Sequence, residues 1–114
     1  MSVKMTTRQV GDVTVVDTVG RITLGEGAST FRDTLRDLAA AGNKKLLLNL
    51  AEVSYIDSSG IGEMVSGFTS VTNQGGQVKL LNLTKRVKDL LQITKLYTVF
   101  EVFDDEAHAV RSFS

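Results

Sequence analysis

The feature that most constrains the fold is a short apolar run in the middle of the chain, Leu46-Leu47-Leu48-Asn49-Leu50. The run lacks the apolar–polar alternation that marks a strand with one side facing solvent. It is therefore typical of a strand covered on both faces, as in a parallel sheet. Parallel strands need crossover connections, so we expect helices before and after this run.

The segments around this run fit that expectation. Residues 3–10 and 13–19 are β-rich and flank Gly11-Asp12, which predicts a hairpin. Further strands are predicted at residues 53–56, 78–81 and 99–103. Helices are predicted at residues 28–41 and 59–73, after the capping residue Thr84, and from Asp104-Asp105-Glu106 onwards.

The order of elements is therefore two strands followed by alternating helices and strands. We predict an α/β fold: a mixed sheet of four to six strands that opens with the hairpin and continues with parallel strands. The parallel strands are expected to be joined by right-handed crossovers. The 114 residues suit a single domain, residues 1–114.

Composition argues against several classes of function. The chain has no cysteine and one histidine, His108, so neither a thiolate site nor a transition-metal site is expected. Thirteen basic and thirteen acidic residues balance. The densest basic run, Lys85-Arg86-Val87-Lys88, reads as a solvated helix face, so direct nucleic-acid binding is not expected. No segment resembles a secretory signal or a membrane span, so we expect a cytoplasmic protein with no membrane insertion.

The candidate site is Asp57-Ser58-Ser59-Gly60-Ile61-Gly62, where a predicted strand turns into a helix. Loops at the carboxyl ends of strands are the usual functional positions of such sheets. Either serine can cap the helix. Gly60 and Gly62 leave the first turn without bulk, either to relieve packing or to let a partner approach. Because a helix N-terminus favours phosphate, the loop either binds a phosphorylated ligand or carries a phosphorylated Ser58.

Two other chemistries are poorly supported. The glycine-rich segment at residues 20–27 lacks the lysine of a phosphate-binding loop, and Glu26 would repel phosphate, so we interpret it as a turn entering the first helix. A nucleophilic serine needs a neighbouring base, and the only histidine, His108, falls in the final predicted helix. The G-x-S-x-G elbow is also absent. We therefore expect no catalytic residue, and no enzyme.

At these residues the chain resembles a STAS domain of the anti-sigma factor antagonist family. The Asp-Ser-Ser-Gly segment, followed by an aliphatic residue and glycine, is the most specific part of the resemblance. The likeness covers nearly the whole chain: the hairpin, Gly20-Arg21-Ile22, the helix through Leu35 and Leu38, residues 46–50 and 53–62, Gly75-Gly76 with residues 78–82, and residues 90–96.

The resemblance implies a mechanism. In such proteins the serine directly after the aspartate, here Ser58, is phosphorylated by a partner that is both a serine kinase and an anti-sigma factor. The unphosphorylated antagonist binds that partner and frees a sigma factor, phosphorylation breaks the complex, and a serine phosphatase restores it. ATP and Mg²⁺ belong to the kinase, so this chain is expected to hold no cofactor.

The resemblance also implies which residues contact the partner. The expected set is Asp57, Ser58, Ser59, Gly60, Ile61, Gly62 and Glu63. We expect a larger side chain at Gly60 to harm partner binding more than folding.

Two residues depart from the family pattern. Glu63 replaces a common aliphatic residue and places a negative charge in the first helical turn, and Lys95 replaces the glycine that usually precedes a leucine. STAS domains also serve as accessory subunits of lipid-transport ATPases. That role, and a small-ligand or nucleotide-binding role for the Ser58 loop, remain alternatives.

Overall fold

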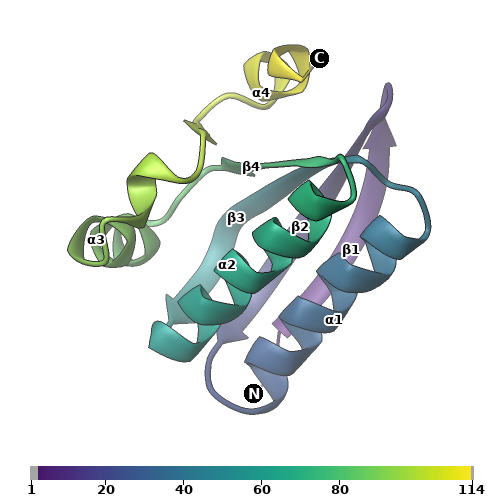
Figure 1. Ribbon diagram of the computed structural model, residues 1–114. Coiled ribbons are helices and arrows are strands. Elements are labelled where there is room, and N and C mark those ends of the chain that lie inside the picture. Colours follow the sequence, from purple (N-terminus) through teal and green to yellow (C-terminus); the bar gives the residue numbers. More distant parts are fainter. Residues whose placement is uncertain (1–2, 114) are drawn as a thin grey trace.

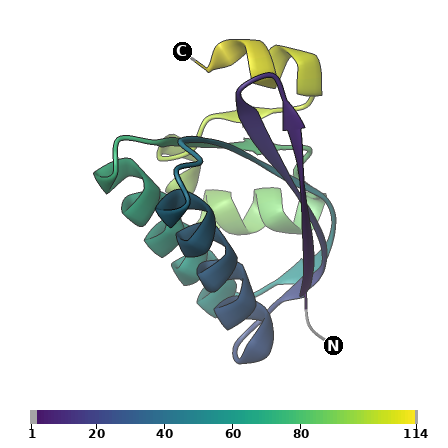
Figure 2. The same cartoon turned by 90° about the vertical axis from the view of Figure 1, so that its right-hand side faces the viewer.

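The computed structural model describes residues 3–113, which form a five-stranded sheet with helices on both faces (Figure 1, Figure 2). The strands are β1 (Val3–Val10), β2 (Val13–Ile22), β3 (Lys45–Ile56), β4 (Gln77–Leu81) and β5 (Val102–Phe103). The helices are α1 (Glu26–Ala40), α2 (Ser58–Asn73), α3 (Lys85–Ile93) and α4 (Glu106–Ser112), with a short 3-10 helix, η1 (Leu96–Thr98), before β5.

The strands lie across the sheet in chain order, β1-β2-β3-β4-β5. β1 and β2 are antiparallel and turn at Gly11, whose φ of +63° suits glycine. The other neighbouring strands pair in parallel. The predicted mixed sheet with its opening hairpin is therefore confirmed.

Two apolar layers enclose the sheet. α1, α2 and α3 contribute Phe31, Met64 and Leu91 to the larger core, and α1 and α2 lie side by side on that face (Figure 1, Figure 2). α4 covers part of the opposite face with a smaller cluster: Val13, Val15, Leu47, Leu81, Ala109 and Phe113. Leu47 and Leu48 point into different clusters and are both fully buried. Burial of residues 46–48 on both faces of the sheet explains why this part of β3 lacks apolar–polar alternation.

Polar contacts fasten α4 to the sheet. Arg8 on β1 donates to Glu106 at 2.6 Å and to Asp17 on β2 at 2.7 Å. The hydrogen bond to Glu106, and to a smaller extent the one to Asp17, raises the pKa of Arg8 above its ordinary value. At the other end of α4, the Nζ of buried Lys79 donates to the carbonyl oxygen of Ser112 at 2.9 Å. This bond satisfies one of the carbonyls that a helix end leaves free.

The last strand is shorter than the sequence predicts. The apolar run at residues 99–103 predicts a strand of that length, but only Val102–Phe103 pairs with β4. The chain before it forms η1 and a turn, and Phe100 is buried edge-on against Phe68, with ring centroids 5.1 Å apart. Although the N–H of Leu80 on β4 donates to the carbonyl oxygen of Glu101 at 2.9 Å, residues 99–101 are not part of the strand, so the prediction is wrong for them.

Some element boundaries also differ from the sequence predictions. Residues 20–22 end β2 instead of forming a turn, and α1 begins at Glu26, earlier than residue 28. Thr84 caps α3 as predicted. Lys95, at the position where the family usually has glycine, has a φ of +62°. Glycine adopts this left-handed conformation without steric cost, which explains the preference for it there.

Candidate functional site

Asp57 caps the start of α2. Its backbone is extended, and its Oδ1 accepts a hydrogen bond from the N–H of Gly60 at 2.9 Å. The sequence left this role to either serine, but Ser58 is already the first helical residue and Ser59 follows it. Aspartate and serine cap equally well, so only the position of the turn decides between them.

Asp57 also ties α2 to the turn between β2 and α1. Its Oδ2 accepts from the N–H of Leu24 at 3.0 Å, and its own N–H donates to the carbonyl oxygen of Ile22 at 3.3 Å. Burial acts to raise the pKa of Asp57, but hydrogen bonds from the backbone N–H groups of Leu24, Gly60 and Ser59 outweigh it and hold that pKa below its ordinary value. Asp57 therefore stays ionised and fixes this turn at neutral pH.

The two serines differ in exposure. Ser58 is exposed, and its hydroxyl makes no hydrogen bond to any residue from 3 to 113. Ser59 is half-buried. The N–H groups that a helix start offers to an anion are partly taken, because Gly60 donates to the Asp57 carboxylate and Ile61 donates to the Asp57 carbonyl oxygen at 3.0 Å. Ser58 can be reached from solvent, but the loop offers few donors to a bound phosphate.

The two glycines face different surroundings. Gly60 is buried, and a Cβ on it would overlap the carbonyl oxygen of Ile22 and lie 2.7 Å from Cγ1 of Ile56. A Cβ on Gly62 would have nothing within 4 Å. The expectation that Gly60 leaves room for a partner is therefore wrong, because β2 fills that space. Only Gly62 opens the surface beside Ser58.

The remaining residues of the predicted contact set also divide between the core and the surface. Ile61 is 4 % exposed and belongs to the main core. Glu63 lies beyond the first turn, contrary to the sequence prediction. Its carboxylate is 3.6 Å from a guanidinium nitrogen of Arg32 on α1. The negative charge of Glu63 is thus balanced across the α1–α2 contact.

The fold brings one residue to this site that the sequence did not identify, and groups two arginines around Tyr55. Leu24 is 79 % exposed beside Asp57. The guanidinium groups of Arg21 and Arg86 lie 5.0 and 4.4 Å from the centroid of the Tyr55 ring. Leu24 lies in the turn between β2 and α1, whereas Arg21, Tyr55 and Arg86 come from β2, β3 and α3. They share no sequence pattern, so only the tertiary structure shows these contacts.

Neither a histidine nor a group of metal-ligating side chains is found beside Ser58 in the described part of the chain. His108 lies on α4, at the opposite end of the molecule from the start of α2 (Figure 1, Figure 2), and its ring contacts Phe103 with centroids 5.2 Å apart. Within residues 3–113 no three histidine or acidic side chains are grouped to hold a metal ion. A serine becomes a strong nucleophile when a neighbouring base activates it, and the one histidine among residues 3–113 is not beside Ser58.

Comparison with known proteins gives consistent matches. The family model described as "STAS domain" matches residues 4–109. The anti-sigma-B factor antagonist of Bacillus subtilis is 40 % identical over 75 residues, which cover 66 % of this chain and 68 % of that protein. In the described part of the chain, no helix is long and apolar enough to span a membrane.

Solved structures agree with this fold. The structure of an anti-sigma factor antagonist from Mycobacterium paratuberculosis superposes with a TM-score of 0.85 at 16 % identity, covering 97 % of this chain and 93 % of that one. The Bacillus cell fate determinant SpoIIAA, solved in its phosphorylated form, gives a TM-score of 0.73 at 18 % identity, covering 95 % and 97 %. At these identities the structural likeness shows the fold alone.

Proposed function

The chain belongs to the STAS domain family, and to the anti-sigma factor antagonists within it, and from this membership we propose that Ser58 switches it between two states. Unphosphorylated, it binds an anti-sigma factor that is also a serine kinase, and a sigma factor is released. Phosphorylated, it leaves that partner until a serine phosphatase removes the phosphate. The kinase supplies ATP and Mg²⁺.

One observation carries the proposal: Ser58 is exposed at the start of α2 beside the open surface at Gly62. A kinase must bring its active site to the hydroxyl, and Gly62 presents no side chain in its way. Ser59 is half-buried and less accessible. We therefore expect the partner to cover Ser58, Gly62 and the neighbouring Leu24, and the kinase to modify Ser58 but not Ser59.

The local charges explain why phosphorylation would break the complex. A phosphate adds about −1.5 to −2 charge at neutral pH. It would stand beside the ionised Asp57, which already uses the N–H group of Gly60. Under a partner surface this charge would lose its water, and against acidic groups the cost is several kcal/mol. A loss of about 3 kcal/mol weakens binding by more than about a hundredfold.

One protein of the same fold has been described in two phosphorylation states. The Bacillus protein SpoIIAA, a neighbour by fold, has been solved both phosphorylated and unphosphorylated. We extend phosphorylation to Ser58 of this chain by the position of the serine after the aspartate. We also expect the purified chain to turn over neither ATP nor ester substrates.

Capture from cells that make the protein tests the proposal. Ser58→Ala should retain the partner because it cannot be phosphorylated, and Ser58→Asp should retain less. The captured partner is then incubated with ATP in separate reactions with the wild type, with Ser58→Ala and with Ser59→Ala. We expect phosphate on the wild type and on Ser59→Ala, and none on Ser58→Ala. Undiminished labelling of Ser58→Ala would assign the modification to another residue.

A further inference from the structure

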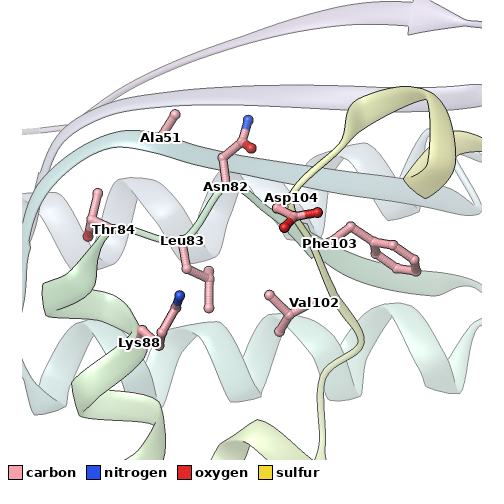
Figure 3. Close-up of a pocket in the computed structure, with 8 residues that line it drawn as sticks. All are labelled: Ala51, Asn82, Leu83, Thr84, Lys88, Val102, Phe103 and Asp104. Carbon is pink, nitrogen blue, oxygen red and sulfur yellow. The ribbon is translucent and has the colours of Figure 1, made fainter.

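A second surface feature lies apart from the Ser58 turn, at the carboxyl ends of β4 and β5. It is an open hollow of about 580 Å³ between α3, β3 and the last strand (Figure 3). Asn82 follows β4 with a φ of +58°, and Asp104 follows β5. Ligands of α/β sheets bind outside the carboxyl ends of the strands, which is where this hollow lies.

Two opposite charges face this hollow without partners. Figure 3 shows Lys88 on α3 at one side and Asp104 at the other, with Leu83 and Val102 between them. Among residues 3–113 neither charged side chain makes a hydrogen bond or an ion pair, with the other or with any third group. Both residues are exposed, so each charge faces solvent and can meet a ligand group of opposite sign there.

The hollow continues into an apolar one. A second space of about 300 Å³ shares Leu83, Lys88 and Val102 with the first, and is also lined by Leu91, Tyr97 and Phe100. Val102 is 42 % exposed and Tyr97 is 55 % exposed, so both still present apolar surface to solvent. Lys88 lines both spaces, so its charge lies where they meet, while Asp104 lines only the first and apolar side chains line most of the second. The joined space is within the size range of small-molecule sites.

We propose that this joined hollow binds a free α-amino acid with an apolar side chain. The carboxylate of the amino acid would meet the ammonium of Lys88, and its own ammonium would meet the carboxylate of Asp104. Its side chain would lie along Leu83 and Val102 towards Tyr97. This pairs both free charges and covers the exposed apolar surface at once.

Charge complementarity favours this ligand class over simpler ones. A fatty acid or another plain anion would pair Lys88 but leave Asp104 unmatched beside an apolar chain. An apolar amine would leave Lys88 unmatched in the same way. Charge-assisted hydrogen bonds are the stronger kind, so a ligand that makes two of them gains most here. The site is separate from Ser58 and does not depend on the proposed switch.

Amide NMR of the full chain tests the proposal with three matched probes: L-phenylalanine, hydrocinnamate, which lacks the ammonium, and phenethylamine, which lacks the carboxylate. We expect L-phenylalanine to give saturable shifts at the amides of Leu83, Lys88 and Val102. Each analogue should bind at least about tenfold more weakly, because it loses one charge-assisted bond. L-Leucine should shift the same amides as L-phenylalanine.

Charge-removing variants supply the control. Lys88→Met and Asp104→Asn should each weaken L-phenylalanine binding at least about tenfold. Lys4→Met and Asp37→Asn make the same changes at exposed positions outside the hollow and should leave it unchanged. The amide spectrum of each variant shows whether the fold is kept. The proposal is overturned if L-phenylalanine and L-leucine give no saturable shift, if the analogues bind equally well, or if the shifts map to the Ser58 turn.

Discussion

Near the start of α2, the side that faces the core and the side that faces solvent each carry a glycine, but for opposite reasons. On the inner side Gly60 lies against the backbone of β2, where no side chain fits, and Ile61 fills the core next to it. On the outer side Gly62 lies near Ser58 with open space in front of it. Glycine is thus a folding requirement at one position and leaves a free surface at the other. Only the outer side is available to a partner.

The largest effect is expected at the inner side. Gly60→Leu should lower the free energy of unfolding by about 3 kcal/mol or more, because the added atoms meet backbone that cannot move aside. This reverses the expectation from sequence that binding would suffer more than folding. Urea unfolding followed by circular dichroism measures the change. If Gly60→Leu kept the stability of the wild type, β2 and α2 would have to separate easily. Gly60 would then not differ from Gly62 in its importance for folding.

A smaller loss of stability is expected on substituting Asp57, which caps α2. Asp57→Ala removes the cap of α2 and the acceptor for the N–H of Leu24, and should cost about 1–2 kcal/mol. Asp57→Asn keeps an acceptor for one of these bonds and should cost less. The same urea experiment compares them. An unchanged Asp57→Ala midpoint would show that neither hydrogen bond stabilises the turn.

The carboxylate of Asp57 also predicts a dependence on pH. Because folding lowers its pKa, the stabilisation by Asp57 is fully present above the unfolded value of about 3.9 and is lost as the pH falls through the lower folded value. The stability difference between wild type and Asp57→Asn should therefore shrink below about pH 4. Urea midpoints measured across the acid range check this. A difference that persists to the lowest pH would show that charge is not involved.

The smallest effect on stability is expected at the outer side. Gly62→Leu should change the free energy of unfolding by less than about 1 kcal/mol, since leucine is a better helix former and its Cβ would have no neighbour within 4 Å. Binding to the captured partner should nevertheless fall, because the leucine would stand beside Ser58. A pull-down with wild type and variant separates these results. Full binding by Gly62→Leu would move the contact surface elsewhere.

Local patterns predicted the elements whose structure depends on local causes. Gly11-Asp12 predicted the hairpin because its turn needs only those residues, and the run at residues 46–50 predicted the doubly covered strand. The strand at residues 99–103 failed because the pattern cannot show that Phe100 turns inward to Phe68. At Lys95 the family pattern added information, since the usual glycine matches the positive φ found there.

The sequence predicted which segment forms the site, but not which of its residues are exposed. The sequence located the turn at Ser58, yet which glycine is buried depends on the Ile22 carbonyl, which lies on another strand. The roles of Leu24 and of the arginines around Tyr55 follow from the same long-range packing. The hollow between Lys88 and Asp104 combines residues from several elements, so no sequence motif could predict it.

The most direct test of the account compares the affinity of the captured partner for the unphosphorylated chain and for the chain phosphorylated at Ser58. Calorimetry measures the affinity, and amide NMR of the free chain in both states reports on its structure. We predict a weakening of more than about a hundredfold, with shifts confined to the surroundings of residues 57–63. Equal affinities of the two forms would contradict the proposed switch, and shifts spread through β5 would contradict its local nature.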